Sequence, residues 1–543
     1  MYNHKKSNGQ VETYHLIDIF YDKKKYLLDF IAIAIVISSY ILGYYSFKYN
    51  QDFHHTGIQL SYLIDYKNGF KFFQEIYLQY GQGQTIFLFI IDKVFNINFF
   101  TIGIVVQIIY CLNLILIYKV ICFLTKKYYA LLILFFIYLI HPYAVYAWPD
   151  YYSGLCLTLA AYFLLKSKKY NIFNYFFCSF LLFLSIFFRT SYLITIIPAF
   201  FLLFIFCKLN FFKYKINILF LFFIFFLVIY FIYLNKNLYN WYYQGLGSIT
   251  QYAYGSTHNL MSTIIDNFGE NIWLFLKFLK MFFRFVFKLL NLFVLNNFIF
   301  TFFFLINLYY FFVIFIQKKR KKINFFETRL IFLSFIGFFG FAQSFMIYST
   351  FKNINSSLGI FFLGIYILEK IKFSKFLFLM VRIIILLIVV MLILKFPNVS
   401  NYTRLILKND GSFVKSQINV FSDSNLLIEN NNYYIKLSEV ICNQDKKIIN
   451  LSFDYVIPYI CNYNLKKYSV LGGMPFQKNS VEDKLHKRIF VDYILFDDEM
   501  LITSKDINSP YFKKIFELDL PTNIMWYSMY DSDSKKIFVY INS

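Results

Sequence analysis

The chain has 543 residues, of which 59% are hydrophobic, 24% aromatic and only 15% charged. A water-soluble chain of this length would form three or four domains, and so few charged residues cannot cover their surfaces. The composition therefore excludes soluble globular, disordered and collagen-like proteins, and it predicts an integral membrane protein.

Apolar segments long enough to cross a membrane recur along the chain. Lipid offers no hydrogen-bond partners to the backbone, so the chain crosses a bilayer as a helix. A bilayer core about 30 Å thick needs roughly 20 apolar residues in each such helix. The pattern predicts a polytopic all-α bundle of about eleven transmembrane helices. The predicted spans lie near residues 28–48, 99–123, 128–147, 152–166, 171–188, 191–207, 216–234, 295–317, 330–348, 356–371 and 376–396.

The cations give this bundle an orientation. The formal net charge of +23 is concentrated in alternate loops, which face the cytoplasm under the positive-inside rule. An odd number of spans with a cytoplasmic N-terminus then places everything after Pro397 outside. The charge is therefore a topology signal, and no nucleic-acid partner is expected. The cationic runs are Lys23–Lys25, Lys126–Lys127, Lys166–Lys169, Lys208–Lys215, Lys318–Lys322 and Lys370–Lys375.

The first predicted outside segment, from about residue 50 to 98, carries the densest polar motif. Asp52 follows the first span, and His54, His55 and Gly57 come soon after it. A carboxylate at headgroup level has a moderate desolvation cost, and its pKa can rise enough for a general base. Asp52 is therefore the candidate catalytic residue, and Glu75 is the reserve. Asp65 and Asp92 are expected to be solvated charges.

The same segment continues with a predicted helix and a second motif. Leu60, Leu63 and Tyr66 share one helical face, and Asn68-Gly69 is expected to end the helix. Gln79-Tyr80-Gly81 follows, and then an apolar run from Thr85 to Phe95. That run is too short to cross the membrane, so it is expected to lie along the interface.

The two later outside segments supply charges of both signs. Asp150 follows an aromatic stretch at a helix mouth, where it is either an N-cap or an acceptor-binding residue. Arg189 interrupts an apolar stretch, as a functional residue or an interfacial anchor. The third segment has cations at helical spacing that would hold a donor phosphate or touch lipid phosphates. These cations are Lys277, Lys280 and Arg284.

Together these features suggest a site for a lipid-linked anion at the outer leaflet. In direct displacement at a sugar carbon, Asp52 would take the acceptor hydroxyl proton while phosphate leaves from the opposite face. Arg189 and the three cations of the third segment would stabilise that phosphate.

The first outside segment also resembles that of a known family. The segment has an aspartate soon after the first span, then two histidines and a glycine, a helix ending near Asn-Gly, and Gln-Tyr-Gly. This order is similar to that of the first extracytoplasmic loop of bacterial GT-C glycosyltransferases. The resemblance implies an inverting hexosyl- or pentosyltransferase in the bacterial inner (cytoplasmic) membrane. It would move a sugar from a polyprenyl-phosphate donor to an envelope glycan or lipid acceptor. It carries over Asp52 as the catalytic carboxylate and six positions of the loop motif, namely His54, His55, Gly57, Gln79, Tyr80 and Gly81. Related loops often have an acidic residue where this chain has Thr56.

Other interpretations stay open at this stage. Adjacent histidines diverge on a helix or strand, so His54 and His55 are poorly placed to chelate one metal together. No metal site is predicted, although a divalent metal shared by Asp52, His54 and Asp150 is an alternative. The competing functions are an O-antigen-type polysaccharide polymerase, and a transporter or flippase without chemistry.

The composition changes near residue 398, which separates a transmembrane domain (1–397) from an extracytoplasmic domain (398–543). Apolar runs at Ile448–Tyr455, Arg488–Phe496 and Lys536–Asn542 predict strands in a soluble mixed α/β domain. Cys442 and Cys461 lie in this domain and would pair in an oxidising compartment. The other five cysteines lie in or beside spans, where they are expected to be small apolar residues.

Overall fold

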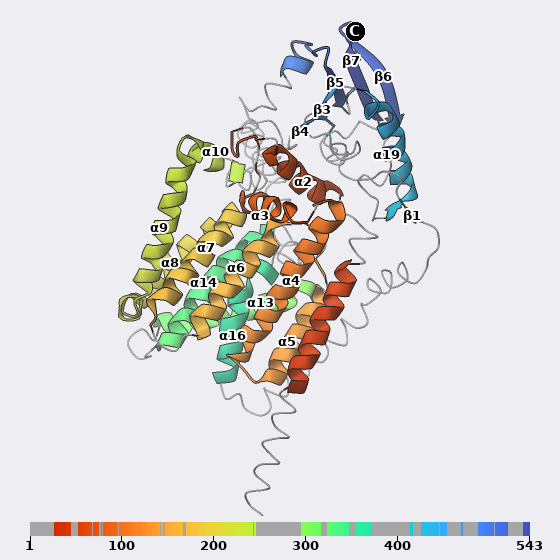
Figure 1. Ribbon diagram of the computed structural model, residues 1–543. Helices are drawn as coiled ribbons and strands as arrows, with labels where there is room; N and C mark the ends of the chain where they lie inside the picture. Colours follow the sequence, from red (N-terminus) through yellow and green to blue (C-terminus); the bar gives the residue numbers. More distant parts are fainter. Residues whose placement is uncertain are drawn as a thin grey trace, which may run out of the picture.

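The computed structural model of the protein is largely helical, with a small sheet formed by its C-terminal part (Figure 1). It describes residues 26–44, 53–67, 69–74, 76, 78, 80–95, 97–141, 143–144, 147–166, 170–242, 244–245, 295–316, 323–346, 354–370, 413–415, 425–444, 446–452, 468–470, 487–503, 505–519 and 536–543.

Ten of the eleven predicted apolar windows coincide with helices, and window 376–396 lies outside the described residues. Further helices lie between these windows: α2 (Phe53–Lys67), α3 (Gly83–Asp92), η1 (Thr190–Tyr192), η2 (Asn235–Asn237) and α10 (Leu238–Tyr242). The helices in the ten windows are Tyr26–Tyr44, α4 (Phe99–Cys122), α5 (Lys127–Ile140), α6 (Pro149–Lys166), α7 (Ile172–Phe188), α8 (Leu193–Lys213), α9 (Ile216–Leu234), α13 (Leu295–Ile316), α14 (Phe325–Met346) and α16 (Leu358–Lys370).

Three helices in the described part of the chain are long and apolar enough to cross a membrane: Tyr26–Tyr44, Thr101–Cys122 and Ile216–Tyr242. This is consistent with a membrane protein. Others are shorter than the roughly 20 residues that a span needs, among them α5 with 14 residues and α7 with 17. The count of eleven spans therefore stays a prediction.

The cationic connections gather at one end of the bundle. Lys127 pairs with Asp29, and Lys370 pairs with Glu327. The hydroxyl of Thr125 donates to Glu369 Oε2 at 3.2 Å. These contacts join the start of α5 to the start of the first helix, and the end of α16 to the start of α14 and to the turn between α4 and α5. The sidedness of these loops in a membrane stays a prediction.

The short helices gather at the opposite end. Figure 1 shows α2, α3 and α10 at the top of the bundle and the lower ends of α5 and α16 at the bottom. Gln84 on α3 donates to the Ala147 carbonyl at 2.9 Å, and the Leu78 amide donates to Gln244 Oε1 at 2.9 Å. The predicted end of α2 is confirmed: Gly69 is left-handed (φ 87°), and the Phe70 amide donates to the Asp65 carbonyl at 3.1 Å.

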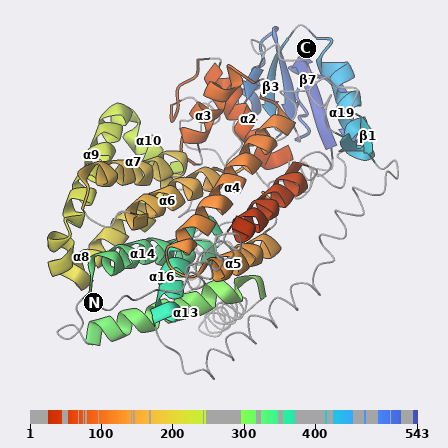
Figure 2. The same cartoon turned by 60° about the horizontal axis from the view of Figure 1, so that its bottom comes forward.

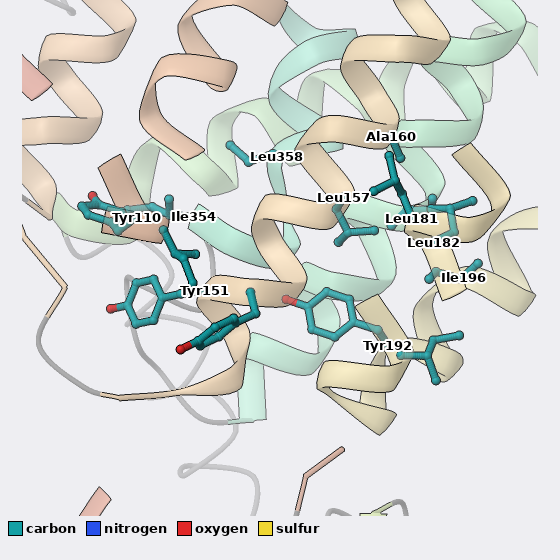
Figure 3. Close-up of a cluster of buried hydrophobic side chains, with 14 of the residues drawn as sticks. Tyr110, Tyr151, Leu157, Ala160, Leu181, Leu182, Tyr192, Ile196, Ile354 and Leu358 are labelled. Carbon is teal, nitrogen blue, oxygen red and sulfur yellow. The ribbon is translucent and has the colours of Figure 1, made fainter. Parts of the chain in front are cut away.

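Helix α6 lies at the centre of the bundle, in contact with α4, α7 and α14 (Figure 2). Of its 18 residues, 13 are buried, and the other five follow a single helical face: Leu155, Leu159, Tyr162, Phe163 and Lys166. Figure 3 shows Tyr151 and Leu157 of this helix among apolar side chains from neighbouring helices. The first turn of α6, residues 149–152, is fully buried, so close packing holds the residues at this end of the helix in place.

Small residues allow α14 and α16 to pack closely. Gly359 on α16 lies so near the Leu333 carbonyl of α14 that an added Cβ would overlap it. Asn307 Nδ2 donates to the Ile360 carbonyl at 2.9 Å, and the Ser334 hydroxyl donates to Asn307 Oδ1 at 2.6 Å. Inside a bilayer, where apolar burial gives helices no net reason to associate, close van der Waals packing and interhelical hydrogen bonds hold them together.

The C-terminal part forms two sheets and a helix. A five-stranded mixed sheet has the order β4-β3-β5-β7-β6; β3 is parallel to β4 and β5, and β7 is antiparallel to β5 and β6. Its strands are β3 (Lys447–Leu451), β4 (Tyr468–Val470), β5 (Glu499–Thr503), β6 (Phe512–Asp519) and β7 (Lys536–Asn542). Strands β1 (Phe413–Lys415) and β2 (Asn425–Leu427) pair antiparallel, and α19 (Ile428–Ile441) packs against β6.

The sheet shares a core with the helical bundle. Leu437, Ile448 and Val539 are buried in the same hydrophobic cluster as α4 and α6, and β4 lies against α2. The predicted boundary at 397/398 falls outside the described residues.

One of the three predicted strands is wrong. Lys536–Asn542 is β7, and the first half of Ile448–Tyr455 lies in β3, whereas residues 453–455 lie outside the described residues. Arg488–Phe496 instead forms a helical turn and a loop. The Asp492 amide donates to the Lys487 carbonyl at 2.9 Å, and Tyr493 is left-handed (φ 54°). The apolar alternation there has another cause, since Ile489 and Leu495 face a small second core beside the sheet.

Strand β6 is the outer edge of the five-stranded sheet. Its exposed Lys514 forms ion pairs with Glu517 at 3.1 Å and with Asp506 at 3.3 Å. The Tyr540 hydroxyl donates to Asp506 at 2.6 Å, and this bond, together with Lys514, lowers the pKa of the Asp506 carboxyl.

The cysteines largely follow the prediction. Cys111, Cys122, Cys156 and Cys178 are free, and all but Cys122 are buried. Cys442 is disulfide-bonded. Its expected partner, Cys461, lies outside the described residues, so this pairing stays a prediction.

The close packing of α14 and α16 gives a first test. Gly359→Ala is expected to lower the free energy of unfolding by about 2–3 kcal/mol, because the added methyl group must displace the backbone of α14. Gly69→Ala is the control. No atom lies near its added methyl group, so the free energy of unfolding should fall only by the cost of alanine in a left-handed backbone conformation, about 1 kcal/mol. Titration of the purified protein with a denaturing detergent measures both. Equal losses would contradict the proposed close approach.

Candidate functional site

A buried ion pair joins the N-terminus of α6 to the C-terminus of α7. Arg189 Nη1 donates to Asp150 Oδ2, and the two side chains are 10% and 3% exposed. Arg189 Nε also donates to the Ser191 hydroxyl at 2.9 Å. Each charge suits its place, because a helix N-terminus favours an anion and a C-terminus favours a cation.

The local sequence explains both positions. Pro149 is the first residue of α6, which suits proline because a first-turn amide needs no helical partner. Asp150 is therefore the second residue of the helix, and the N-cap position belongs to Trp148. The prediction that Asp150 is the N-cap is wrong by two positions. Arg189 ends α7 in an extended conformation, and its amide donates to the Ser185 carbonyl at 3.0 Å.

Two aromatic rings cover the guanidinium. The Arg189 Cζ atom lies 5.2 Å from the ring centre of Tyr80 and 5.5 Å from that of Trp148. The two rings are themselves 5.2 Å apart. Both contacts are cation–π interactions, which strengthen when the cation is shielded from water.

Gly81 fixes the Tyr80 loop to this corner. Its amide donates to the Phe188 carbonyl at 3.1 Å, and an added Cβ would overlap the Phe187 carbonyl. The Thr190 hydroxyl donates to the Tyr80 carbonyl at 3.4 Å. Tyr80 and Gly81 therefore meet the α7–η1 turn through their backbone, and the close approach explains the glycine.

Further buried polar atoms lie near this corner on α3, its N-cap and η1. Gln82 Oε1, Thr85 Oγ1 and the Tyr192 hydroxyl have no hydrogen-bond partner within the described part of the chain, and each residue is at most 2% exposed. Leaving a buried polar atom unpaired costs about 1–3 kcal/mol, so these atoms are suited to a polar ligand or ordered water.

The structure brings together four of the residues that the sequence singled out: Tyr80, Gly81, Asp150 and Arg189. Gly57 is buried within α2, and His54 and His55 belong to α2, although their side chains are not described. The remaining candidates lie outside the described residues, and they are Asp52, Glu75, Gln79, Lys277, Lys280 and Arg284.

Two predicted solvated charges are corrected. Asp65 is 4% exposed, because the face of α2 that carries it packs inward. Asp92 pairs with Lys67 at 2.6 Å and accepts from the Ile97 amide at 2.9 Å. Trp148 and Ser191 were not identified as contacts of Arg189; their only sequence signal is that they stand two positions from Asp150 and Arg189.

The described residues contain no group of three or more His, Cys, Asp or Glu side chains that would hold a metal ion. Asp150, a ligand in the metal alternative, is instead paired with Arg189. The other two residues of that alternative, Asp52 and His54, are not described at side-chain level, so it stays untested.

Comparison with known proteins assigns no family. No protein-family profile matches the chain, and no curated protein is a significant match. The resemblance to GT-C glycosyltransferases therefore stays an expectation from the sequence, based on the motif in residues 52–81 and on the predicted arrangement of spans.

A double-mutant cycle tests the ion pair. Asp150→Asn and Arg189→Gln are each expected to lower the free energy of unfolding by about 3 kcal/mol, because each leaves a buried charge unpaired. The double variant is expected to lose clearly less than the sum. The exposed pair Lys514 and Glu517, both changed to Gln, is the control and should couple by less than about 1 kcal/mol. Additive losses at Asp150 and Arg189 would show that the two charges are not paired.

Proposed function

We propose that the chain is an inverting membrane glycosyltransferase of GT-C type that transfers a sugar from a polyprenyl-phosphate donor to an envelope glycan or lipid. One observation carries the proposal. Two residues of the loop motif that resembles this family, Tyr80 and Gly81, lie against the buried Arg189–Asp150 pair. The motif, Asp150 and Arg189 were singled out by different sequence features, and their convergence supports a common site.

The donor set of Arg189 suits a phosphate. A guanidinium carries five N–H donors, and within the described part Arg189 uses one at Nε and one at Nη1. The free donors can bind phosphate oxygens while Asp150 keeps the charge compensated. The Tyr80 and Trp148 rings shield the guanidinium from water, which strengthens its attraction for an anion.

The position of the site suits a lipid-borne donor. It lies at the end of the bundle that holds α2 and α3, away from the cationic connections (Figure 1). In the proposed orientation this end faces outward, at the depth of lipid headgroups. The isoprenoid would then remain in the bilayer while its phosphate reaches Arg189.

Asp52 is the proposed base, directly before the first residue of α2. It would remove the proton from an acceptor hydroxyl as that oxygen bonds to the anomeric carbon of the donor. The bond between this carbon and the phosphate oxygen breaks, and its electron pair leaves with the phosphate, whose charge Arg189 stabilises. Attack opposite the leaving group inverts the anomeric centre.

The decisive experiment compares envelope glycans. Cells lacking the protein are complemented with wild type, Asp52→Asn, or the control Asp492→Asn on the exposed loop of the C-terminal part. Mass spectrometry of glycans and polyprenyl lipids should show one sugar missing and its polyprenyl-phosphate donor accumulating in the Asp52→Asn cells. Losing a general base lowers the rate about 100-fold or more, whereas Asp492→Asn should restore transfer fully.

Other outcomes identify the competing functions. Normal glycosylation by an Asp52→Asn protein that inserts at wild-type levels would refute the assignment of the base. Accumulation of single oligosaccharide units on a lipid carrier would instead indicate a polymerase. Loss of surface glycan with normal transfer in permeabilised cells would indicate a transporter.

A further inference from the structure

The C-terminal tip of α3, defined as residues 89–95, exposes an apolar surface. Ile90, Val94 and Phe95 are 59%, 74% and 66% exposed. The other side of the helix is packed: Leu88 is fully buried, and the Phe89 ring meets the Tyr66 ring of α2 edge-on at 5.0 Å. Val94 and Phe95 lie in the turn that follows α3, where their amides donate to the Ile91 carbonyl at 2.9 and 2.8 Å, so the exposed side chains are held in place.

The tip carries one uncompensated positive charge. Asp92 is neutralised by Lys67 at 2.6 Å, and it also holds the turn by accepting from the Ile97 amide. Lys93 lies 4.8 Å from the ring centre of Phe89 and has no acidic partner in the described part of the chain. A partly solvated ammonium group beside exposed apolar side chains is complementary to an anionic lipid surface.

The chain fixes the depth of this tip. Asn98 caps α4, with the Thr101 amide donating to Asn98 Oδ1 at 2.9 Å and the Asn98 amide donating to the Thr101 hydroxyl at 2.6 Å. The segment Thr101–Cys122 that follows is long and apolar enough to cross a membrane. Only five residues separate Phe95 from the start of that segment, so the tip lies near the level where α4 would enter the bilayer.

We propose that the α3 tip inserts Ile90, Val94 and Phe95 into the headgroup–acyl boundary of the membrane, and that Lys93 selects anionic phospholipids there. This inference requires that α4 spans a bilayer and is independent of glycosyl transfer. The other end of α3 begins at Gly83, beside Phe187 and Phe188 next to Arg189. Anchoring the tip therefore also sets the height of the Arg189 site above the lipid.

Fluorine NMR of the full chain in lipid nanodiscs tests the insertion. Trifluoromethyl-phenylalanine replaces Phe95 in one sample and, as the control, Tyr511 in another, since Tyr511 is 62% exposed in the C-terminal part. Lipids with a spin label high on the acyl chain should broaden the signal at position 95 and leave position 511 unchanged. Broadening of position 95 by a soluble gadolinium chelate alone, or by neither probe, would overturn the proposal.

A charge variant tests the lipid preference. Broadening at position 95 is compared for spin-labelled phosphatidylglycerol and phosphatidylcholine in mixed nanodiscs. Lys93→Gln should reduce the preference for phosphatidylglycerol about fivefold, as expected for about 1 kcal/mol from one lysine near an anionic surface. Lys166→Gln is the matched control, because Lys166 lies 5.3 Å over the Tyr162 ring on a different helix. An unchanged preference in Lys93→Gln would refute the role of Lys93.

Discussion

The arrangement of the site depends on one constraint, the ion pair between Asp150 and Arg189. Two charges that are almost fully removed from water must compensate each other, so the ends of α6 and α7 are held in a fixed relation. The loop carrying Tyr80 then covers the pair, and Gly81 makes this possible because no side chain intervenes. A buried pair of this kind contributes little net stability, but it penalises any packing that separates its partners.

The helices were largely predictable because their signals are local. Length and apolarity located ten windows, and the Asn68-Gly69 signal correctly located the end of α2. Strand prediction was less successful, because apolar residues alternate along any segment that has one buried side, whether or not the segment is a strand. At Arg488–Phe496 a helical turn and a loop bury Ile489 and Leu495 in this way. Arg488 Nη2 donates to Glu499 Oε2 of β5 at 2.7 Å. No local rule distinguishes this case from a strand.

The site was predictable only in its components. Asp150 and Arg189 each stood out as charges beside apolar segments, but their pairing joins residues 39 positions apart and depends on how α6 packs against α7. The burial of Asp65 likewise follows from the side of α2 that faces the bundle. Such contacts require tertiary structure, whereas the glycine of the Gln-Tyr-Gly motif could be identified without it.

The charged outer edge of the sheet has a consequence for how densely the protein can be expressed. A free edge strand offers unpaired amide and carbonyl groups to any neighbouring chain, and alternating lysine and acidic side chains discourage such pairing. Lys513, Lys514 and Glu517 place such charges along β6. Many copies crowded on one membrane surface should therefore stay unaggregated through this edge.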